Sequence, residues 1–359
     1  MRVGCLAGAT TVLATTDALH EDLNDLATKL GLVPRREVSS GLLSTGVADK
    51  YRPRVDLVWS LALSSVQRES IGWLLQRPVT EVTELPMVAV EVEATAPSTK
   101  TVEADIANLC AFGAPLGLVV VSEKGEQGQY RRAARTIRTL RRSFGDIRVL
   151  PVEADWVAPL RARTWTSGTQ VAPQNLRLAP AGGETRDWTA TARREFKERG
   201  ERAGFVVAEP YVPTILATAF EHVKATRALR HMTDPRKKSF KEILRAADYF
   251  SASKLDMAWL LPLPIALSEF VGELSMCDPC LTENGMLFAN AWGYLPLAAI
   301  EFETYAGKHA GGGLLNLAAY GVFGVAVGSS KAVTRDLESR LATYRPTLGL
   351  RNVFVRAAP

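Results

Sequence analysis

Short apolar runs bounded by turn residues indicate two buried strands early in the chain. Residues 54–59 are Arg-Val-Asp-Leu-Val-Trp, and residues 86–92 are Pro-Met-Val-Ala-Val-Glu-Val. Both runs are rich in Val, which favours a strand in segments of this length. Between them, Ser64-Ser-Val-Gln67 has the spacing of a capping box, so we expect a helix from there to about Gln76.

An alternation of helices and strands continues on either side of these two runs. Apolar positions with helical spacing predict helices at 18–30 and 100–112. The apolar run at 116–122 predicts a further buried strand. An Arg-rich helix at 130–143 and a last strand at 147–152 complete an α/β pattern, for which we expect a mixed sheet with helices on both faces.

The chain changes character after this first pattern. Residues 161–187 are rich in Thr, Pro and Gly, which is typical of a linker or a long loop. From Asp187 onward the polar and apolar positions follow a chiefly helical pattern, and no internal repeat is evident. We therefore predict a core at 1–160, a linker or loop at 161–187 and a mainly helical region at 188–359.

Acidic side chains occupy positions of the second strand where a core strand normally carries Val. Alternation places Glu91 and Glu93 on one face with Ala89, whereas the valines at 88, 90 and 92 face the other way. Two carboxylates this close on an apolar strand repel each other and lose hydration, so they need a cation or strong donors. A divalent metal is the simplest such partner, and Asp56 on the neighbouring strand could supply a third carboxylate.

Two alternatives to a metal site stay open at this point. The acids could lie on a solvated face, or they could pair with Arg or Lys side chains. The small Ala89 and the flanking valines argue against an ordinary solvated face. If the helix expected after Ser64 does not form, Glu81 or Glu84 would replace Asp56 as the first acid of the set.

The order of these elements resembles the PD-(D/E)XK nuclease superfamily. It runs from a Pro-x-x-Asp strand through a Glu-x-Glu strand, a helix and an apolar strand to a basic helix, over about residues 15–155. The resemblance implies a restriction-endonuclease-like core and Mg²⁺-dependent hydrolysis of phosphodiester bonds in double-stranded DNA, most simply by a type II restriction enzyme. A palindromic site would imply a homodimer. The region at 188–359 would then read bases or support dimerisation.

The resemblance also implies roles for individual residues. Asp56 and Glu91 would hold Mg²⁺. Glu93 stands where the family usually has Lys, so it would bind the metal or orient the attacking water as a general base. Lys100 is a candidate for the missing cation near the phosphate, with a surface role as the alternative. The long separation between Asp56 and Glu91 is a second departure from the family pattern.

Basic residues gather in two places that could contact a DNA backbone. The first is a stripe at helical spacing within 130–143, made of Arg131, Arg135, Arg138 and Arg142. The second lies within 224–245, where a basic turn joins two predicted helices and includes Arg236, Lys237 and Lys238. A solvated outer face is the alternative for each cluster.

Composition is compatible with these expectations but does not decide among them. The chain has 359 residues and a net charge of +5, with a pI of about 9.0, which suits a polyanionic partner. Four Cys residues are too few for a disulfide framework, so we expect a reducing cytoplasm. Cys277-Asp-Pro-Cys280 lacks two further ligands with suitable spacing for structural zinc, so we expect two buried thiols.

Several other classes of protein are disfavoured. The apolar run at 3–14 resembles a signal peptide only faintly, and the Gly-rich run at 310–328 contains Asn316, so we expect no membrane span. The sequence contains no Walker loop, and we therefore expect no nucleotide cofactor. Two functional alternatives to a restriction enzyme remain: a non-catalytic DNA-binding or assembly protein, and a repair or transposition nuclease of the same superfamily.

Overall fold

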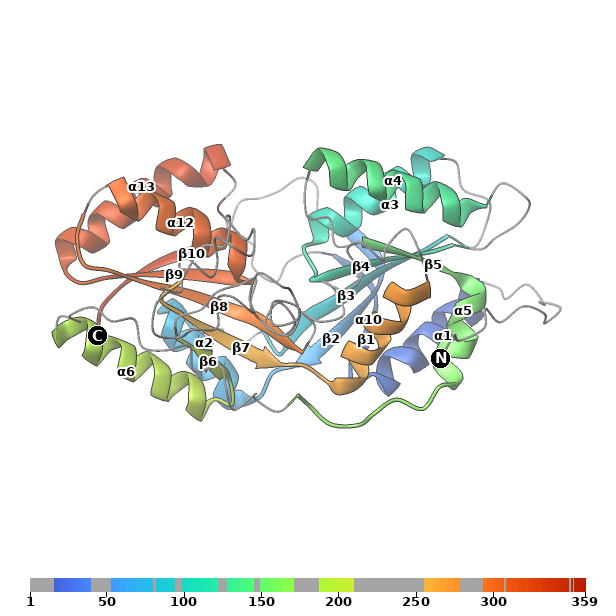
Figure 1. The fold of residues 1–359 in the computed structure, drawn as a ribbon, viewed down its shortest axis with the longest axis horizontal. Coiled ribbons are helices and arrows are strands. Elements are labelled where there is room, and N and C mark those ends of the chain that lie inside the picture. The colour runs from blue at the N-terminus through green and yellow to red at the C-terminus, as the bar shows by residue number, and fades with distance from the viewer. Residues whose placement is uncertain are drawn as a thin grey trace, which may run out of the picture. The chain divides into compact units, whose positions relative to one another are not determined.

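The structure is a computed structural model, and it forms two compact units (Figure 1). Described residues up to 62 and from 84 to 165 form the first unit, and those from 63 to 83 and from 166 onward form the second. The part of the chain that the structure describes consists of residues 16–39, 53–79, 82–93, 99–121, 128–144, 149–170, 187–209, 255–277, 293–306, 308–348, 350 and 352–359.

The first unit is built on a five-stranded mixed sheet in which the strands follow one another in sequence order. The first three strands pair antiparallel, and the last two join in parallel. The parallel pairs need crossovers, and a helix supplies each one. The strands are β1 (Val33–Ser39), β2 (Arg54–Ala62), β3 (Glu84–Glu93), β4 (Leu116–Val121) and β5 (Val149–Glu153).

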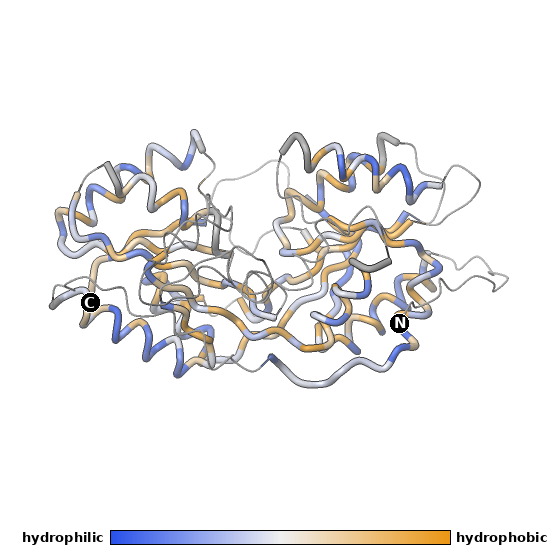
Figure 2. The backbone as a smooth tube through the Cα atoms, viewed as in Figure 1, coloured by the Kyte–Doolittle hydropathy of each residue, from blue (hydrophilic) through white to orange (hydrophobic). Residues whose placement is uncertain are grey.

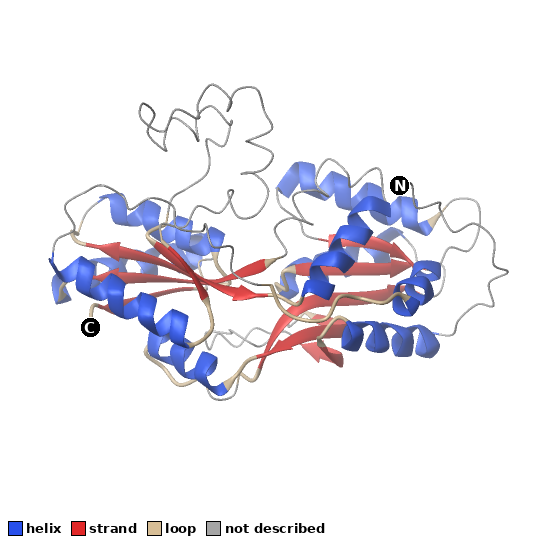
Figure 3. Ribbon diagram, turned by 60° about the horizontal axis from the view of Figure 1, so that its bottom comes forward, coloured by secondary structure: helices blue, strands red, loops and turns tan. Residues whose placement is uncertain are grey.

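Helices cover both faces of this first sheet (Figures 1 and 3). On one face, α3 (Thr99–Phe112) and α4 (Gln129–Phe144) pack over the strands through a cluster that includes Ala89 and Ile106. On the other face lie α1 (Thr16–Lys29) and α5 (Ala154–Ala162). The sequence prediction of a mixed α/β unit with helices on both faces is confirmed, and so are its individual strands and helices.

The second unit contains another five-stranded mixed sheet, again in sequence order. Its helices are α6 (Asp187–Arg202), α10 (Ile265–Cys277), α12 (Lys308–Tyr320) and α13 (Lys331–Leu348). Its strands are β6 (Val206–Ala208), β7 (Met257–Pro262), β8 (Tyr294–Glu303), β9 (Phe323–Gly328) and β10 (Val353–Ala357). The strands of both sheets are largely apolar, as the orange tube in Figure 2 shows.

The predicted capping-box helix forms, but it belongs to the second unit. Helix α2 (Ser65–Leu75) begins after Ser64, whose side chain accepts the backbone N–H of Gln67 at 3.2 Å. At its other end, the guanidinium of Arg356 lies 4.1 Å from the centre of the Trp73 ring and donates to the Trp73 carbonyl at 2.8 Å. Because α2 packs in the second unit, the chain leaves the first unit after β2 and returns to it at β3.

The second sheet corrects the expectation of a mainly helical C-terminal region. It also corrects the expectation of no internal repeat, because the second sheet has the strand order and directions of the first. Even the register irregularity recurs, after Trp59 in β2 and after Trp259 in β7. Short apolar runs fit a buried helix as well as a strand, and differing loop lengths hide the repeat from a fixed-period search.

The Gly-rich apolar run near the end of the chain folds into a helix and a strand of the second unit. The Gly-rich run at 310–328 forms most of α12 and all of β9. Within the described ranges, no helix combines the length and the apolar character that crossing a bilayer requires.

Two helical glycines of the second unit allow a matched test of its packing. A Cβ on Gly200 would lie 2.6 Å from Nε1 of the fully buried Trp259, whereas a Cβ on Gly312 would have no atom within 4 Å. Ala is favoured over Gly in a helix by up to about 1 kcal/mol. We expect Gly312→Ala to raise the free energy of unfolding and Gly200→Ala to lower it, in urea denaturation. Equal stabilisation by both would contradict the packing of α6 on β7.

Candidate functional site

The antiparallel pairing of β2 and β3 brings Asp56 and Glu91 together. Leu57 is the register partner of Val90, so the residues that flank this pair, Asp56 and Glu91, are neighbours across the two strands. The backbone N–H of Asp56 donates to Oε2 of Glu91 at 3.4 Å, and the N–H of Val92 donates to Oδ2 of Asp56 at 2.8 Å. The two predicted acids therefore meet, and the prediction that they lie on adjacent strands is confirmed.

Glu93 and Asp105 extend the pair into a cluster of four carboxyl groups, which we call the acid cluster: Asp56, Glu91, Glu93 and Asp105. Glu93 lies on the same strand face as Glu91 and donates a hydrogen bond to Asp105 of α3. Sequence reasoning missed Asp105. The signal was present, because Asp105 immediately precedes Ile106 and therefore borders the buried stripe of α3.

Burial and mutual repulsion keep protons on this cluster. Only 7% of Glu91 is exposed, and burial together with the charges of Asp56 and Asp105 raises its pKa to about 8. Burial and the hydrogen bond to Asp105 raise the pKa of Glu93 to about 8 as well. The pKa of Asp105 is also raised, chiefly by burial. In the metal-free protein near pH 7, Glu91 and Glu93 are therefore largely protonated.

No described basic residue neutralises the acid cluster. Among the residues that the structure places, no Lys, Arg or His forms an ion pair with any of its four members. Oδ2 of Asp105 is buried and has no hydrogen-bond partner. Within the same described residues, no three acidic, His or Cys side chains converge as a metal site. Among the described residues, the charge of the cluster is thus limited by bound protons and not by a basic side chain.

A corresponding set of acids occurs in the second unit. Asp256, directly before β7, accepts the backbone N–H of Phe302 through Oδ2 at 2.9 Å. Glu301 lies next to it on β8, and its pKa is raised by burial and by Asp256 but lowered by Arg193. Arg193 of α6 pairs with the other oxygen of Asp256, Oδ1, and with Oε1 of Glu209, the latter at 3.2 Å.

Sequence reasoning did not single out this second set of acids. The signal was the segment Leu295-Pro296 followed by Glu301-Phe-Glu303, which repeats the spacing of Leu85-Pro86 and Glu91-Val-Glu93.

The other candidates for the first acid do not join the acid cluster. Glu84 lies at the opposite end of β3 from Glu93, where it accepts a hydrogen bond from Nε of Arg35 at 3.2 Å. Glu81 lies outside the described residues. Lys100 is the second residue of α3, and its side chain is outside the described part.

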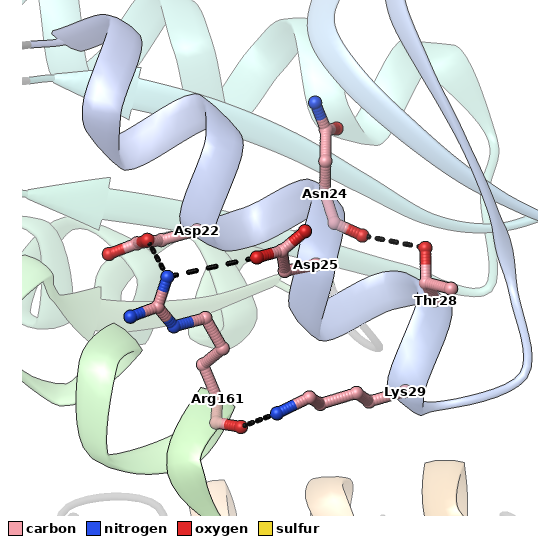
Figure 4. A network of polar contacts seen from close by, with 6 residues as sticks. All are labelled: Asp22, Asn24, Asp25, Thr28, Lys29 and Arg161. Atoms are coloured by element: carbon pink, nitrogen blue, oxygen red, sulfur yellow. Dashed lines mark hydrogen bonds and ion pairs between the residues drawn. The ribbon is translucent and has the colours of Figure 1, made fainter.

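The acids of α1 are engaged in other contacts (Figure 4). Arg161 of α5 pairs with Asp22 and lies 3.7 Å from Asp25, while Nζ of Lys29 donates to the Arg161 carbonyl at 2.7 Å. Glu21 pairs with Arg36 at the surface. These ion pairs fasten α1 to α5 and β1, so the α1 acids have a structural role instead of contributing to the acid cluster.

The first predicted DNA-binding stripe lies on α4. Arg131, Arg135 and Arg138 are exposed there, and Arg142 lies in the last turn, where its side chain is not described. Helix α4 covers the same face of the sheet as α3, which carries Asp105. The second predicted cluster, with Arg236, Lys237 and Lys238, lies outside the described residues, as does Cys280. Cys277 ends α10, and its side chain is likewise not described.

Comparison with known proteins produced no match. No protein-family model, no curated protein and no solved structure is similar to this chain at a significant level.

The raised pKa of Glu91 makes a prediction about stability. Because Glu91 keeps a proton in the folded state up to about pH 8 but loses it near pH 4.5 when unfolded, folding stability should fall between these values. Glu91→Gln removes this loss, so it should stabilise the metal-free protein at pH 8 by roughly 1–3 kcal/mol and much less at pH 5. The exposed Glu103→Gln on α3 is the control. Equal effects of both variants at each pH would contradict the assignment.

Proposed function

We propose that the first unit is a metal-dependent nuclease that hydrolyses phosphodiester bonds of double-stranded DNA, with Mg²⁺ as the cofactor. The observation that carries the proposal is the acid cluster itself. Four carboxyl groups come together from adjoining ends of β2 and β3 and from the middle of α3, two of them holding protons up to about pH 8. Such a set lowers the free energy of unfolding, because a buried carboxyl without a counter-charge loses its hydration. Groups of this kind are typical of sites that bind a ligand or act in catalysis.

The order of elements supports a PD-(D/E)XK assignment. That resemblance implies an acidic strand, a Glu-x-Glu strand, a helix, an apolar strand and a basic helix, and the chain supplies β2, β3, α3, β4 and α4 in that order. The acids also fall at strand ends that pair with each other. Within this superfamily, a type II restriction enzyme is the proposal, and a repair or transposition nuclease is the related alternative.

The donor set fits a hard divalent cation. Carboxylate oxygens are the ligands that Mg²⁺ prefers, and Oδ2 of Asp105 is a buried acceptor that lacks a partner. Asp56 and Glu91 would hold the ion, with Glu93 as a third ligand, once Glu91 and Glu93 have lost their protons. When bound, Mg²⁺ supplies charge stabilisation at the scissile phosphate and lowers the pKa of a bound water.

The remaining chemistry falls to the side chains of the chain. As the alternative to binding the metal, Glu93, whose pKa is about 8, would accept a proton from the attacking water as a general base. In the metal-free protein, the hydrogen bond from protonated Glu93 to Asp105 holds the Glu93 side chain in place. The backbone N–H of Val92 holds one oxygen of Asp56 in place, which leaves Oδ1 as the oxygen that can turn to a ligand. Lys100 at the start of α3 remains a candidate donor to a phosphate oxygen.

Helix α4 is the proposed DNA-binding surface of this unit. Its exposed Arg131, Arg135 and Arg138 share one face and would contact phosphates without reading sequence. We propose that Arg142 and the basic residues at 236–238 also contact DNA phosphates. We further propose a homodimer in the cytoplasm, since a palindromic duplex site requires two equivalent subunits.

A non-catalytic DNA-binding or assembly protein is the second candidate. It is favoured by one observation, namely that no three acids of the described residues stand together as a metal site. In that case the acid cluster would be a structural proton-sharing network, and the Arg stripe alone would carry the function.

A cleavage assay separates the two candidates. We expect supercoiled plasmid bearing suitable sites to be cut with Mg²⁺ but not with EDTA. Asp56→Asn and Glu91→Gln should each lower the single-turnover rate by about 100-fold or more, because each removes charge that balances the metal. Glu103→Gln, an exposed change on α3, should keep the parental rate.

The outcome that contradicts the nuclease proposal is equally specific. It is a protein that shifts duplex DNA in a gel-mobility assay and still cuts no genomic DNA with Mg²⁺ or Mn²⁺. That result would contradict the nuclease proposal and support a non-catalytic DNA-binding protein. Cleavage by Glu91→Gln at the parental rate would instead place the chemistry at another site.

A further inference from the structure

The strands of the two units can be matched residue by residue from their hydrogen-bond registers. In each unit, an aspartate on or next to the second strand lies opposite the first Glu of the Glu-x-Glu pair. Asp56 lies opposite Glu91, and Asp256 lies opposite Glu301. Asp56 Oδ2 accepts the N–H of Val92 at 2.8 Å, and Asp256 Oδ2 accepts the N–H of Phe302 at 2.9 Å. The matched acids are therefore Asp56 with Asp256, Glu91 with Glu301, and Glu93 with Glu303.

The first helices of the two units match through the glycines that follow them. Gly31 after α1 and Gly204 after α6 both have positive φ, at 78° and 82°. Counting back the same number of residues from each glycine pairs His20 of α1 with Arg193 of α6. The buried positions agree with this match, since Leu23 pairs with Phe196 and both are buried.

The helices that cover the acids match through a shared close approach. A Cβ on Gly117 of β4 would touch Cβ of Leu109 at 3.1 Å, and a Cβ on Gly324 of β9 would touch Cβ of Leu317 at 2.5 Å. Leu109 and Leu317 are thus equivalent, and four residues earlier Asp105 matches Gly313. A Cβ on Gly313 would lie 2.9 Å from Oε1 of Glu303, which is where Asp105 meets Glu93 in the first unit.

Two exchanges on the covering helices distinguish the second set of acids from the acid cluster. At the position of Asp105 it has Gly313, which removes one carboxyl. At the position of His20 it has Arg193, which adds a permanent positive charge and pairs with Asp256 and Glu209. The guanidinium of Arg193 also lies 5.2 Å from the centre of the Phe302 ring of β8, a contact that adds to its two ion pairs in fixing its position.

We propose that the second unit is a copy of the first in which Arg193 has replaced the bound cation, so that of the two matched acid sets only the acid cluster takes up a divalent cation. A guanidinium that already pairs with Asp256 balances the charge of that carboxylate and occupies its oxygen Oδ1, while Oδ2 accepts the backbone N–H of Phe302. The inference rests on the proposed function in one respect, that the acid cluster binds a divalent cation. Its consequence is that, of the two matched acid sets, only the acid cluster can serve as a cutting centre.

The number of Mn²⁺ ions bound per folded chain tests this directly, by electron paramagnetic resonance of free Mn²⁺ during titration of metal-free protein. We expect one ion for the parent, none for Asp56→Asn and one for Asp256→Asn. Arg193→His, which installs the residue found in the first unit, should raise the number to two, whereas Arg193→Lys keeps the charge and should stay at one. Combining Arg193→His with Asp56→Asn should leave one ion, at the second site.

The possible results separate the two claims. One ion lost on Asp256→Asn, or two ions in the parent, would overturn the inference. So would a folded Arg193→His protein that still binds one ion. No ion in the parent but one in Arg193→His would refute metal binding by the first unit while supporting the role of Arg193. If Arg193→His does not fold by circular dichroism, the Asp56→Asn and Asp256→Asn results decide the question.

Discussion

Buried like-charged carboxyl groups on neighbouring strands impose the constraint on which the rest of the structure depends. Glu91 is almost fully buried beside Asp56, and their closeness follows from the register of β2 and β3. A carboxylate in this position needs a proton or a cation, because burial removes its hydration and no described basic side chain pairs with it. The strand pairing that forms the first sheet therefore also places buried carboxyl groups together that need a counter-charge. We propose that a divalent cation supplies this charge.

The two units differ in how the charge of their buried acids is balanced. In the first, protons balance the acids, and Asp105 adds a further carboxyl from α3. In the second, Arg193 reaches Asp256 from α6, and Gly313 stands where Asp105 would be. The backbone contacts to the two aspartates are nearly identical at 2.8 and 2.9 Å, so the difference lies in side chains and not in the fold. Exchangeable protons suit a site that takes up a ligand, whereas a fixed guanidinium suits a structural core.

Sequence reasoning recovered the first unit because its signals are local. The Val-rich strands and the stripe of α3 each depend on nearby residues, and the structure has them. The capping box at Ser64 is equally local, and its helix forms in the second unit. Sequence reasoning failed where the structure depends on contacts between residues that are far apart in the sequence. The apolar runs of β7 and β9 fit a helix as well as a strand until their pairing is known. Asp105 becomes part of the site only through the packing of α3 over β3, and Arg193 only through a contact across α6 and β7.

Proton release on metal binding tests the central claim most directly. Titration calorimetry of Mg²⁺ into the metal-free protein at pH 7, in two buffers with different ionisation enthalpies, gives the number of protons released per ion. We expect about one to two protons, since Glu91 and Glu93 must lose theirs to bind a cation, and release that disappears above about pH 9. Absence of binding at millimolar Mg²⁺, or binding without proton release at pH 7, would contradict the account.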